Sequence, residues 1–574
     1  MKYKLIGEND FFINPIETIL KNRGIEDIEK FLNLDKSVTD HWNTLVNIEK
    51  AIDCILKHVN NKSKIFVQVD SDADGYCSSA VLINYLKKVF PEVNIEWRLQ
   101  DGKQHGVIVN EVPEDTNLVI IPDAGSEQYE EHKELQQRGI EVIVLDHHEA
   151  DKESERAIVV NNQLSPDYHS KAMTGAGIVY EFCRALDDRL ELNYADNYLD
   201  LAAIGIIGDM ADMKDLGTRY NVLKGLKKVN NPLFKAVMEK QEYSTKGIVN
   251  AINVTFYVVP LINAVVRFGT EEEKQQMMRA FLESDEEIFY KYRKIERYEP
   301  IAVNTARMMA NVKARQAKAV KKGVDILEER IKQKNLLNNK ILIVNVAGAI
   351  DKEFTGLVAN QVSNKYKRPT MLIRPNEENE CQGSARGYDK GHIKDFKQFL
   401  VDTGLFNYCK GHSNAFGVGV DSRKLVEANN LFNEMLKDVE LDLDTYEVDF
   451  IVPSKQLTPD LILDIHKYKN VWSRNVDEPL LVIKNIEVDS LDISFFKGKK
   501  AGSTTGTLKF GVNGVDITKF RCSETEYEEQ FEDGRLVIDV IGKCDLNEYN
   551  GKKTAQFIVS DYEIKEIKEK EILF

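Results

Sequence analysis

Acidic and histidine side chains gather in four short motifs within the first 213 residues, and side chains of these types can bind metal ions. In chain order the motifs are DSDADG, PDAG, LDHH and GDMADM. Carboxylates held close together repel one another unless a cation lies between them. Oxygen ligands suit Mg²⁺ or Mn²⁺, and an imidazole among them favours Mn²⁺. Together, the four motifs could therefore supply the ligands of a site for two metal ions.

The first motif could also be read as a calcium-binding loop, because its spacing is D-x-D-x-D-G. An EF-hand loop needs a glutamate at its twelfth position and a helix before it. The twelfth position counted from Asp70 is Val81, and the preceding residues, KIFVQV, read as a strand. If Asp70 and Asp72 belong to the strand end, their side chains share one face, and Asp74 follows from the turn. A solvated acidic turn is the remaining alternative for this motif.

The elements that must position these motifs alternate between short apolar runs and helical stretches. KIFVQVD, SSAVLINYLKKVF, LVIIPDAG and EVIVLDHH follow one another from residue 64 onward. This pattern predicts a parallel α/β sheet, whose functional residues lie at the carboxyl ends of its strands. Asp70, Asp123 and Asp146 each end, or nearly end, an apolar run. We read Asp209, which follows LAAIGIIG, as a fourth strand-end acid.

The rest of the chain predicts further α/β and β-rich parts. Charged stretches between residues 271 and 335 read as helices, and a second α/β unit begins at KILIVNVAG. Closely spaced β-type runs after about residue 440, such as TGTLKFGV and TAQFIVSDYEI, predict a small antiparallel barrel. The expected division is a helical segment (1–60), an α/β catalytic domain (61–230), a helical connector (231–336), a second α/β domain (337–437) and the barrel (438–574).

The composition is that of a large globular protein. The chain has 574 residues, 43% hydrophobic and 30% charged, which is too long for one hydrophobic core. No apolar run approaches the roughly 20 residues that span a bilayer. The seven cysteines form no C-x-x-C pair and predict reduced thiols in a cytosol. The net charge of −16 argues against a protein that coats nucleic acid. It does not exclude a nuclease, because carboxylates that hold metal ions add negative charge.

The ordered motifs DSDADG, PDAG, DHH and GDMADM resemble those of the DHH phosphoesterase superfamily. The N-terminal RGIEDIEKFLN, the stretch VPLINAVVRFG, the glycine-rich GSARG and KGHSNAFG, and NEYNGKKTAQFIVSDYEI narrow the resemblance to RecJ-like single-strand-specific exonucleases. The resemblance covers nearly the whole chain. It implies a fold in which a DHH domain and a DHH-associated α/β domain are joined by a helical connector and followed by an OB-fold. It also implies that the two α/β domains face one another across a groove for one strand of nucleic acid.

Matched by position, the resemblance implies roles for individual residues. His148 matches a residue near the scissile phosphate, and we expect Asp146 to orient the imidazoles, since metal-bound histidines usually donate their second N–H to a carboxylate. His105 lies in a loop near the metal ions and is a candidate substrate contact. The implied metal ligands are Asp70, Asp72, Asp74, Asp123, His147 and Asp209. The implied substrate contacts of the second α/β domain are Ser384, Arg386, Gly411 and His412, which we place in loops.

Two positions depart from the family pattern. Lys410 stands where the first glycine of Gly-Gly-His is usual, and Leu261 replaces an arginine. The glycine-rich sequence usual before the OB-fold is here VWSRNVDEP. These departures bear on the grip of nucleic acid and on partner choice, and they leave the metal motifs intact.

The resemblance implies a hydrolase that removes nucleotides from single-stranded DNA in the 5′-to-3′ direction, in DNA repair, recombination or replication. It implies two divalent metal ions, Mn²⁺ or Mg²⁺, and single-stranded DNA as partner. A single-strand-binding protein or helicase as a further partner, a monomer, and the cytoplasm of a bacterial or phage-infected cell complete the expectation. Two alternatives remain: a DHH phosphodiesterase for short oligoribonucleotides or cyclic dinucleotides, and a non-catalytic binding scaffold.

Overall fold

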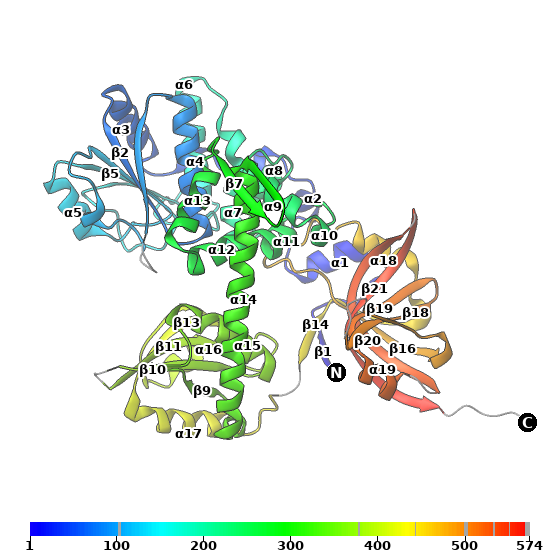
Figure 1. Cartoon of the computed structure of the whole chain (residues 1–574). Coiled ribbons are helices and arrows are strands. Elements are labelled where there is room, and N and C mark those ends of the chain that lie inside the picture. The colour runs from blue at the N-terminus through cyan, green and yellow to red at the C-terminus, as the bar shows by residue number, and fades with distance from the viewer. Residues whose placement is uncertain are drawn as a thin grey trace, which may run out of the picture. The chain divides into compact units, whose positions relative to one another are not determined.

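The structure is a computed structural model that describes residues 1–568 except 101–104, 377–378, 442–443, 499–502, 532–533 and 550. The described chain forms two compact units, which we treat separately (Figure 1). Unit 2 comprises residues 27–316 and 470–477. Unit 1 comprises residues 1–26, 317–469 and 478–574. This grouping places the first 26 residues with the C-terminal parts of the chain, and the finer five-part division stays a prediction.

Unit 2 contains the parallel sheet that the alternating apolar runs predict. Its strands are β2 (Lys64–Val69), β3 (Asn94–Leu99), β4 (Leu118–Pro122), β5 (Glu141–Asp146) and β6 (Ile158–Asn161). They lie in the order β3-β2-β4-β5-β6, and every neighbouring pair is parallel. Both faces are buried. In β4, Leu118 and Ile120 belong to one hydrophobic core, and Val119 and Ile121 belong to another.

Helices cover both faces of this sheet. They include α3 (Ile48–Asn60), α4 (Ala73–Val89), α5 (Tyr129–Gln137), α6 (Gly175–Leu190), α7 (Leu199–Gly208) and α8 (Leu216–Leu226). The larger core contains residues of α3, α4, α6 and α7, whereas Leu135 of α5 packs in the core on the opposite face. The expectation that LAAIGIIG is a strand is wrong, because these residues lie within α7. An apolar run that is buried all round can be a strand or a helix, and periodicity does not distinguish the two.

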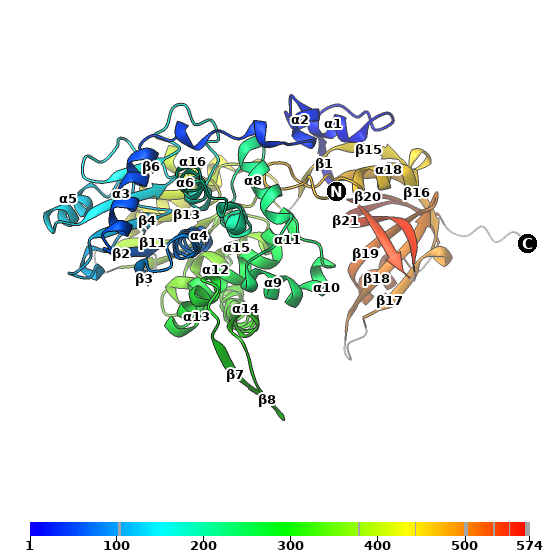
Figure 2. The same ribbon diagram turned by 90° about the horizontal axis from the view of Figure 1, so that it is seen from above.

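The chain after residue 230 is less uniformly helical than predicted. Its helices are α9 (Pro232–Lys240), α10 (Glu242–Thr245), α11 (Ala251–Asn253), a π-helical turn (Val254–Val258), α12 (Val259–Phe268), α13 (Glu271–Phe281) and α14 (Ile301–Gln333). The helical reading of residues 287–300 is wrong. They form an antiparallel hairpin, β7 (Glu287–Tyr292) and β8 (Ile295–Pro300), that extends away from α13 and α14 (Figure 2).

One helical run among the described residues, Ala251–Phe268, is long and apolar enough to cross a membrane by length and composition alone. Half of that run is buried in the protein. Ile262 and Val265 are fully buried and belong to the larger core of unit 2. Core helices of globular proteins share these properties.

Unit 1 contains the second α/β part. Its strands β9 (Leu342–Asn345), β10 (Thr370–Pro375), β11 (Glu380–Arg386), β12 (Phe406–His412) and β13 (Ala415–Asp421) form one sheet in the order β12-β13-β11-β10-β9. Only the β9–β10 pair is parallel among the described pairs. The helices of this part are α15 (Thr355–Tyr366), α16 (Phe396–Asp402) and α17 (Leu425–Met435).

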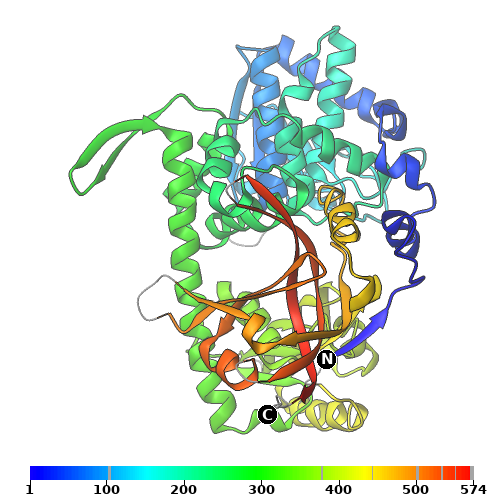
Figure 3. The same ribbon diagram turned by 90° about the vertical axis from the view of Figure 1, so that its right-hand side faces the viewer.

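The C-terminal β-rich part of unit 1 forms a seven-stranded sheet, whose strands are mostly orange to red in Figure 3. The strand order is β15-β16-β20-β21-β19-β18-β17. Its strands are β15 (Phe450–Pro453), β16 (Leu481–Asp489), β17 (Ser494–Lys497), β18 (Thr505–Val512), β19 (Val515–Ser523), β20 (Arg535–Tyr549) and β21 (Lys552–Lys568). Helices α18 (Pro459–His466) and α19 (Glu524–Gln530) accompany it. The expectation of a purely antiparallel arrangement is wrong, since β15–β16 and β19–β21 pair in parallel.

The N-terminal segment was expected to be helical throughout, and the structure corrects this at its start. β1 (Lys2–Leu5) pairs in parallel with β14 (Thr445–Val448). Helices α1 (Pro15–Asn22) and α2 (Ile28–Leu32) follow it. All seven cysteines are free thiols, as expected from their spacing.

Candidate metal centre

Three strand ends and two helix ends of unit 2 bring the predicted metal ligands together, with His147 directly after β5. Asp70 directly follows β2 and Asp123 directly follows β4. Asp72 is the N-cap of α4, where its Oδ1 accepts a hydrogen bond from Gly75 N at 2.9 Å. Asp74 lies in the first turn of the same helix. Asp209 is the C-cap of α7, so the expectation of a fourth strand-end acid is wrong, although the residue reaches the predicted place.

The six predicted ligands fall into two groups of three. In the first group, carboxylate oxygens of Asp70, Asp72 and Asp123 lie within 4.8 Å of one another. In the second, the corresponding ligand atoms are those of Asp74, His147 and Asp209. His147 connects the groups, because its Nε2 lies 3.3 Å from Asp123 Oδ1 and 3.7 Å from Asp209 Oδ2. This arrangement can hold two cations side by side.

Buried carboxylate oxygens in both groups fit the binding of cations. Asp74 Oδ2 and Asp123 Oδ1 are buried, and neither has a hydrogen-bond partner among the described residues. A buried acceptor without a partner is costly. A divalent cation with oxygen and imidazole ligands would satisfy these atoms.

Glycines let three helices approach the carboxylates closely. A Cβ added at Gly75 of α4 would lie 2.6 Å from Asp70 Cβ. One added at Gly175 of α6 would lie 2.2 Å from Asp123 Oδ1, and one at Gly205 of α7 would lie 2.3 Å from Asp74 Oδ1. At Gly175 and Gly205 the helix backbone therefore packs directly against a carboxylate oxygen, and at Gly75 it packs against the Cβ and backbone of Asp70. The Asp123 backbone itself has a φ of 66°, in the left-handed region that few residues other than glycine, asparagine and aspartate adopt.

The electrostatics of the site disfavour ionised carboxylates in the absence of a cation. Burial raises the pKa of Asp70, Asp74 and Asp123, and neighbouring carboxylates raise the pKa of Asp123 further. Burial and then the nearby Asp74 raise the pKa of Asp209 to about 7. Burial also lowers the pKa of His147, which keeps its imidazole neutral and suited to metal ligation. Positive charge among these residues would favour the ionised carboxylates.

The two histidines of the DHH motif have different environments. Asp146 Oδ1 accepts hydrogen bonds from His147 N at 2.7 Å and lies 2.8 Å from His148 Nδ1. The Asp146 carboxylate thus orients the ring of His148, whereas we expected it to orient both imidazoles. The hydrogen bond with Asp146 raises the pKa of His148 to about 9. Burial alone would raise the pKa of Asp146, but its hydrogen bond with His148 holds that pKa below its usual value.

His105 lies beside the metal ligands, as expected. Its Nδ1 is 2.8 Å from Asp70 Oδ2, and more than half of its side chain is exposed. Gly106 N donates a hydrogen bond to the other oxygen of Asp70 at 3.3 Å. Residues 101–104, the start of the loop predicted to lie near the metal ions, are outside the described residues.

Sequence reasoning missed two residues that support this site. Asn161 ends β6, and its Nδ2 donates hydrogen bonds to His148 O at 2.9 Å and Ser126 Oγ at 2.8 Å. Ser126 N in turn donates to Asp146 Oδ2 at 3.0 Å. The sequence contains a pattern that could have identified Asn161. It is a polar residue directly after the apolar run AIVV, in the same position relative to a strand as the strand-end acids.

The predicted substrate contacts of unit 1 lie in strands, so their placement in loops is wrong. Arg386 is the last residue of β11 and His412 is the last residue of β12, and both pair with Ala415 of β13. Ser384 and Lys410 both pair with Gly417, so they form the next row on the same face of the sheet. Cross-strand partners share a face of a sheet. These side chains therefore form two polar rows separated by small residues.

Gly411 lies in β12 between Lys410 and His412, opposite Phe416 of β13. Its φ is 129°, and a Cβ there would lie 2.9 Å from Ala415 O. A larger residue would be strained at this position. The glycine of KGHSNAFG is therefore required by the backbone, whatever its part in binding.

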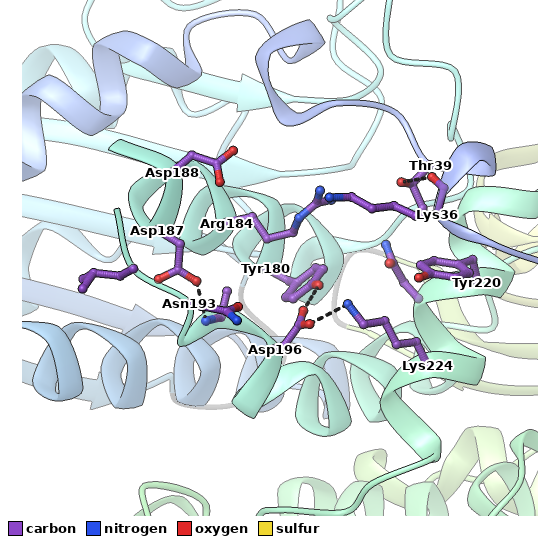
Figure 4. A pocket seen from close by; sticks show the side chains of 13 residues that line it. Lys36, Thr39, Tyr180, Arg184, Asp187, Asp188, Asn193, Asp196, Tyr220 and Lys224 are labelled. Atoms are coloured by element: carbon purple, nitrogen blue, oxygen red, sulfur yellow. Dashed lines mark hydrogen bonds and ion pairs between the residues drawn. The ribbon is translucent and has the colours of Figure 1, made fainter. Parts of the chain in front are cut away.

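A separate pocket in unit 2 contains none of the predicted site residues. It has a volume of about 130 Å³ and lies along α6 and α8 (Figure 4). Its charges are mostly neutralised within the protein. Lys224 Nζ lies 2.6 Å from Asp196 Oδ2, and Arg184 pairs with the buried Glu181 at 2.9 Å. The candidate catalytic site is therefore formed by the two groups of metal ligands and not by this pocket.

Comparison with known proteins identifies the family. The model of the DHH family, N-terminal domain, matches residues 64–206, and that of the RecJ OB domain matches residues 448–561. The chain is 47% identical over 580 residues to the SPbeta prophage-derived single-strand DNA-specific exonuclease YorK of Bacillus subtilis, with all of both chains covered. The chain belongs to the RecJ-like single-strand DNA-specific exonucleases.

More distant RecJ proteins agree with this assignment. The single-stranded-DNA-specific exonuclease RecJ of Bacillus subtilis is 23% identical, and the match covers 98% of this chain and 70% of that protein. The crystal structure of Thermus thermophilus RecJ in complex with Mn²⁺ matches with a TM-score of 0.69 and 20% identity, over 97% of this chain and 77% of that one. The RecJ-like fold, with its DHH domain and C-terminal OB domain, is therefore confirmed.

Proposed function

We propose that this RecJ-like enzyme hydrolyses phosphodiester bonds of single-stranded DNA from an end, using two divalent metal ions. The observation that supports this most directly is the arrangement of Asp70, Asp72 and Asp123 beside Asp74, His147 and Asp209, in two groups of three ligands. Asp74 Oδ2 and Asp123 Oδ1, which accept no hydrogen bond from the described residues, fit Mg²⁺ or Mn²⁺ as ligands. Two such cations supply Lewis-acid activation and charge neutralisation in phosphodiester hydrolysis.

The residues around the ligands would prepare the site for a phosphate. His147 lies between the carboxylates of Asp123 and Asp209, and burial lowers its pKa. Its neutral imidazole would therefore offer a nitrogen lone pair to a metal ion. His148 is more exposed and carries a raised pKa, so its imidazolium can donate a hydrogen bond to a phosphate oxygen. Asp146 holds that imidazole in place through Nδ1. We assign His148 to phosphate contact, Asp146 to its orientation, and the partly exposed His105 to contact with the strand.

We assign the grip on the nucleic-acid strand to residues of unit 1. Arg386 and His412 lie in one cross-strand row, on either side of Ala415, and Ser384 lies in the next row on the same face of the sheet. An arginine, an imidazole and a hydroxyl are suited to phosphate oxygens. Gly411 keeps the strand in the conformation that presents His412. None of these residues is assigned to bond breaking.

The biological setting follows the resemblance to RecJ. We propose 5′-to-3′ polarity and a role in DNA repair, recombination or replication. Seven free cysteines suit a reducing compartment, which supports the bacterial cytoplasm as the place of action. A single-strand-binding protein or helicase as partner, and a monomeric state, stay predictions.

Digestion of end-labelled oligonucleotides tests the reaction. Single-stranded and blunt double-stranded DNA would be incubated with Mn²⁺, Mg²⁺ or EDTA. We expect release of mononucleotides from single strands with either metal ion and none with EDTA. Cleavage of short oligoribonucleotides or cyclic dinucleotides alone would support the alternative phosphodiesterase, and binding without hydrolysis would support a scaffold.

Variants of the two acids of GDMADM test the site within one short loop. Asp209→Asn removes a proposed ligand and should abolish hydrolysis. Asp212→Asn is the matched control, because its Oδ1 accepts a hydrogen bond from Lys214 N and it lies in neither ligand group. We expect Asp212→Asn to retain most of the activity. Equal loss in both variants would contradict the assignment of Asp209.

Tailed duplexes test the polarity. A duplex with a 5′ single-stranded tail should be degraded, and one with a 3′ tail should resist. The opposite preference would contradict 5′-to-3′ action and leave the metal site unaffected.

A further inference from the structure

The hairpin β7–β8 is an ordered element of unit 2 that has no part in the site described above. A two-stranded hairpin is marginally stable alone in water, so its base must be held. Glu299 is buried, and it accepts hydrogen bonds from Asn304 Nδ2 at 3.0 Å and from the guanidinium of Arg307. That guanidinium also lies 3.8 Å from the centroid of the Tyr290 ring. These contacts fix the base of the hairpin to α14.

One face of the hairpin exposes an aromatic pair. Phe289 and Tyr298 are cross-strand partners, and their ring centroids are 5.4 Å apart. Their side chains are 51% and 67% exposed. Aromatic rings with this much exposed surface are suited to stacking on flat partners, and nucleobases present such surfaces.

The tip of the hairpin is basic. Arg293 and Lys294 form the turn between Tyr292 and Ile295, and these two flanking residues are about half exposed. The Arg293 guanidinium lies 5.1 Å from the centroid of the Tyr292 ring. Within the described part of the chain, neither Arg293 nor Lys294 forms an ion pair.

The acidic residues of the hairpin do not offset this charge. Glu299 is buried against Arg307, and Glu296 pairs with Lys291 at 2.6 Å. The remaining acid, Glu287, lies at the base opposite Pro300. The tip is therefore locally positive in a protein with a formal net charge of −16.

We propose that the hairpin is a binding element for single-stranded nucleic acid, separate from the metal centre. Bases would stack on Phe289 and Tyr298, and phosphates would pair with Arg293 and Lys294. Aromatic platforms combined with cations are the general means of binding single strands without sequence preference. This inference rests on the proposed function and adds a second point of contact with the same substrate.

The charge favours nucleic acid over a protein partner. The exposed aromatic pair alone would suit either one. The two cations at the tip form no ion pair with any described residue, and the neighbouring acids are already neutralised. This charge matches a phosphate backbone, which carries one negative charge per nucleotide. A second copy of this chain, with its acidic surplus, is an alternative that the experiment can distinguish.

Binding of a fluorescent single strand of about 30 nucleotides to the full-length protein in EDTA tests the inference. We expect Phe289→Ser/Tyr298→Ser to weaken binding at least about tenfold, because the loss of two stacks together typically costs that much or more. Arg293→Gln/Lys294→Gln should flatten the dependence of log affinity on log salt by about 1.4, or about 0.7 for each lost phosphate contact.

Two controls separate the hairpin from the rest of the molecule. Tyr243→Ser removes an almost fully exposed ring from α10 of the same unit, and it should leave binding unchanged. Hydrolysis of a saturating short strand of about six nucleotides should be the same in the hairpin variants and the wild type, since the metal ligands are intact. Equal binding of the long strand by wild type and both hairpin variants would overturn the inference.

Photocrosslinking gives a direct readout of the contact. A strand that contains 5-iododeoxyuridine should crosslink to Phe289 or Tyr298 and label the peptide of residues 287–300. Labelling confined to other peptides would overturn the inference. If the wild type neither binds nor cleaves single strands, the proposed function itself fails. If instead the hairpin variants bind strands normally but lose self-association in sedimentation, a second copy is the occupant and the inference is wrong.

Discussion

Gly175 lies at the N-terminus of α6, where the helix backbone touches the Asp123 carboxylate. A Cβ at this position would lie 2.2 Å from Asp123 Oδ1 and 2.6 Å from Asp123 Cα. We expect Gly175→Ala to displace this ligand and lower the turnover number about 100-fold, because small misplacements have effects of this size. The free energy of unfolding should fall by only about 1–3 kcal/mol. Hydrolysis of labelled single strands and urea unfolding measure the two effects.

Gly511 provides the control for this substitution. A Cβ at Gly511 of β18 would have nothing within 4 Å, so Gly511→Ala should leave both quantities nearly unchanged. Wild-type turnover by Gly175→Ala at moderate Mn²⁺ concentration would contradict the close contact between α6 and the site.

His132 of α5 makes stability depend on pH. It is fully buried, and burial lowers its pKa from 6.5 to about 4. The unfolded chain therefore binds a proton near pH 6.5, whereas the folded chain resists protonation until about pH 4. The stability that neutral His132 confers is fully present above pH 6.5. As the pH falls to 4, the free energy of unfolding decreases by about 3 kcal/mol.

Urea unfolding of wild type and His132→Gln between pH 4 and 7.5 measures this contribution. As the pH falls, the wild type should lose about 3 kcal/mol more unfolding free energy than the variant. A difference that stays constant with pH would show that His132 is not buried in its neutral form.

The sequence predicts residues of the site well where one rule governs them. Asp70 and Asp123 follow buried strands, and parallel strand ends meet at one edge of a sheet. His147 follows from the motif that contains it. The supporting roles of Asn161 and Gly175 depend on which helix or loop lies opposite, and that is set by tertiary packing that no local pattern encodes.

At the scale of elements, the strand ends of β11, β13 and β12 align Arg386, Ala415 and His412. Arg386→Ala should lower kcat/KM about 10- to 150-fold with little effect on kcat, since a charge-assisted hydrogen bond contributes about 1.5–3 kcal/mol. The dependence of log affinity on log salt should also flatten by about 0.7. Binding of a labelled single strand at several salt concentrations, with single-turnover kinetics, measures both.

Arg423 is the matched control for Arg386. It follows β13, at the opposite end from Ala415, and pairs with the adjacent Asp421. Arg423→Ala should leave kcat/KM unchanged. A loss of kcat alone in Arg386→Ala would instead assign this arginine to the transition state.

The elements that the sequence mispredicts share one cause. The run LAAIGIIG is apolar on every side, and α7 is buried on every side, so its composition fits a core strand or a core helix equally. Residues 287–300 are rich in charges that favour helices, although FYKY and IERY contain the aromatic residues of a strand. Tertiary contacts, such as the burial of Glu299 against Arg307, decide between the two conformations.

At the scale of the whole molecule, all six proposed metal ligands belong to unit 2. Calorimetry should therefore show two unfolding transitions. Mn²⁺ should raise the midpoint temperature of the unit 2 transition only. A ligand at 100 times its dissociation constant stabilises the state that binds it by about 2.7 kcal/mol. This energy corresponds to a shift of several degrees for the transition of unit 2.

Asp74→Asn is the control for this measurement. It removes one ligand, so it should abolish the Mn²⁺-induced shift of the unit 2 transition. The transition of unit 1 should stay in place. Equal shifts of both transitions by Mn²⁺ would show that the two units unfold together or that the ions bind elsewhere.

The pairing of β1 with β14 fixes an order of events during synthesis. β1 leaves the ribosome well before its partner, residues 445–448, which follows more than 400 residues later. At about 5–20 residues per second, the N-terminal strand waits roughly 20–90 s for its partner. The buried Asp449, which binds Arg23 at 3.0 Å, arrives equally late. Unit 2 can complete its sheet during this interval, so the earliest residues of the chain are among the last to fold.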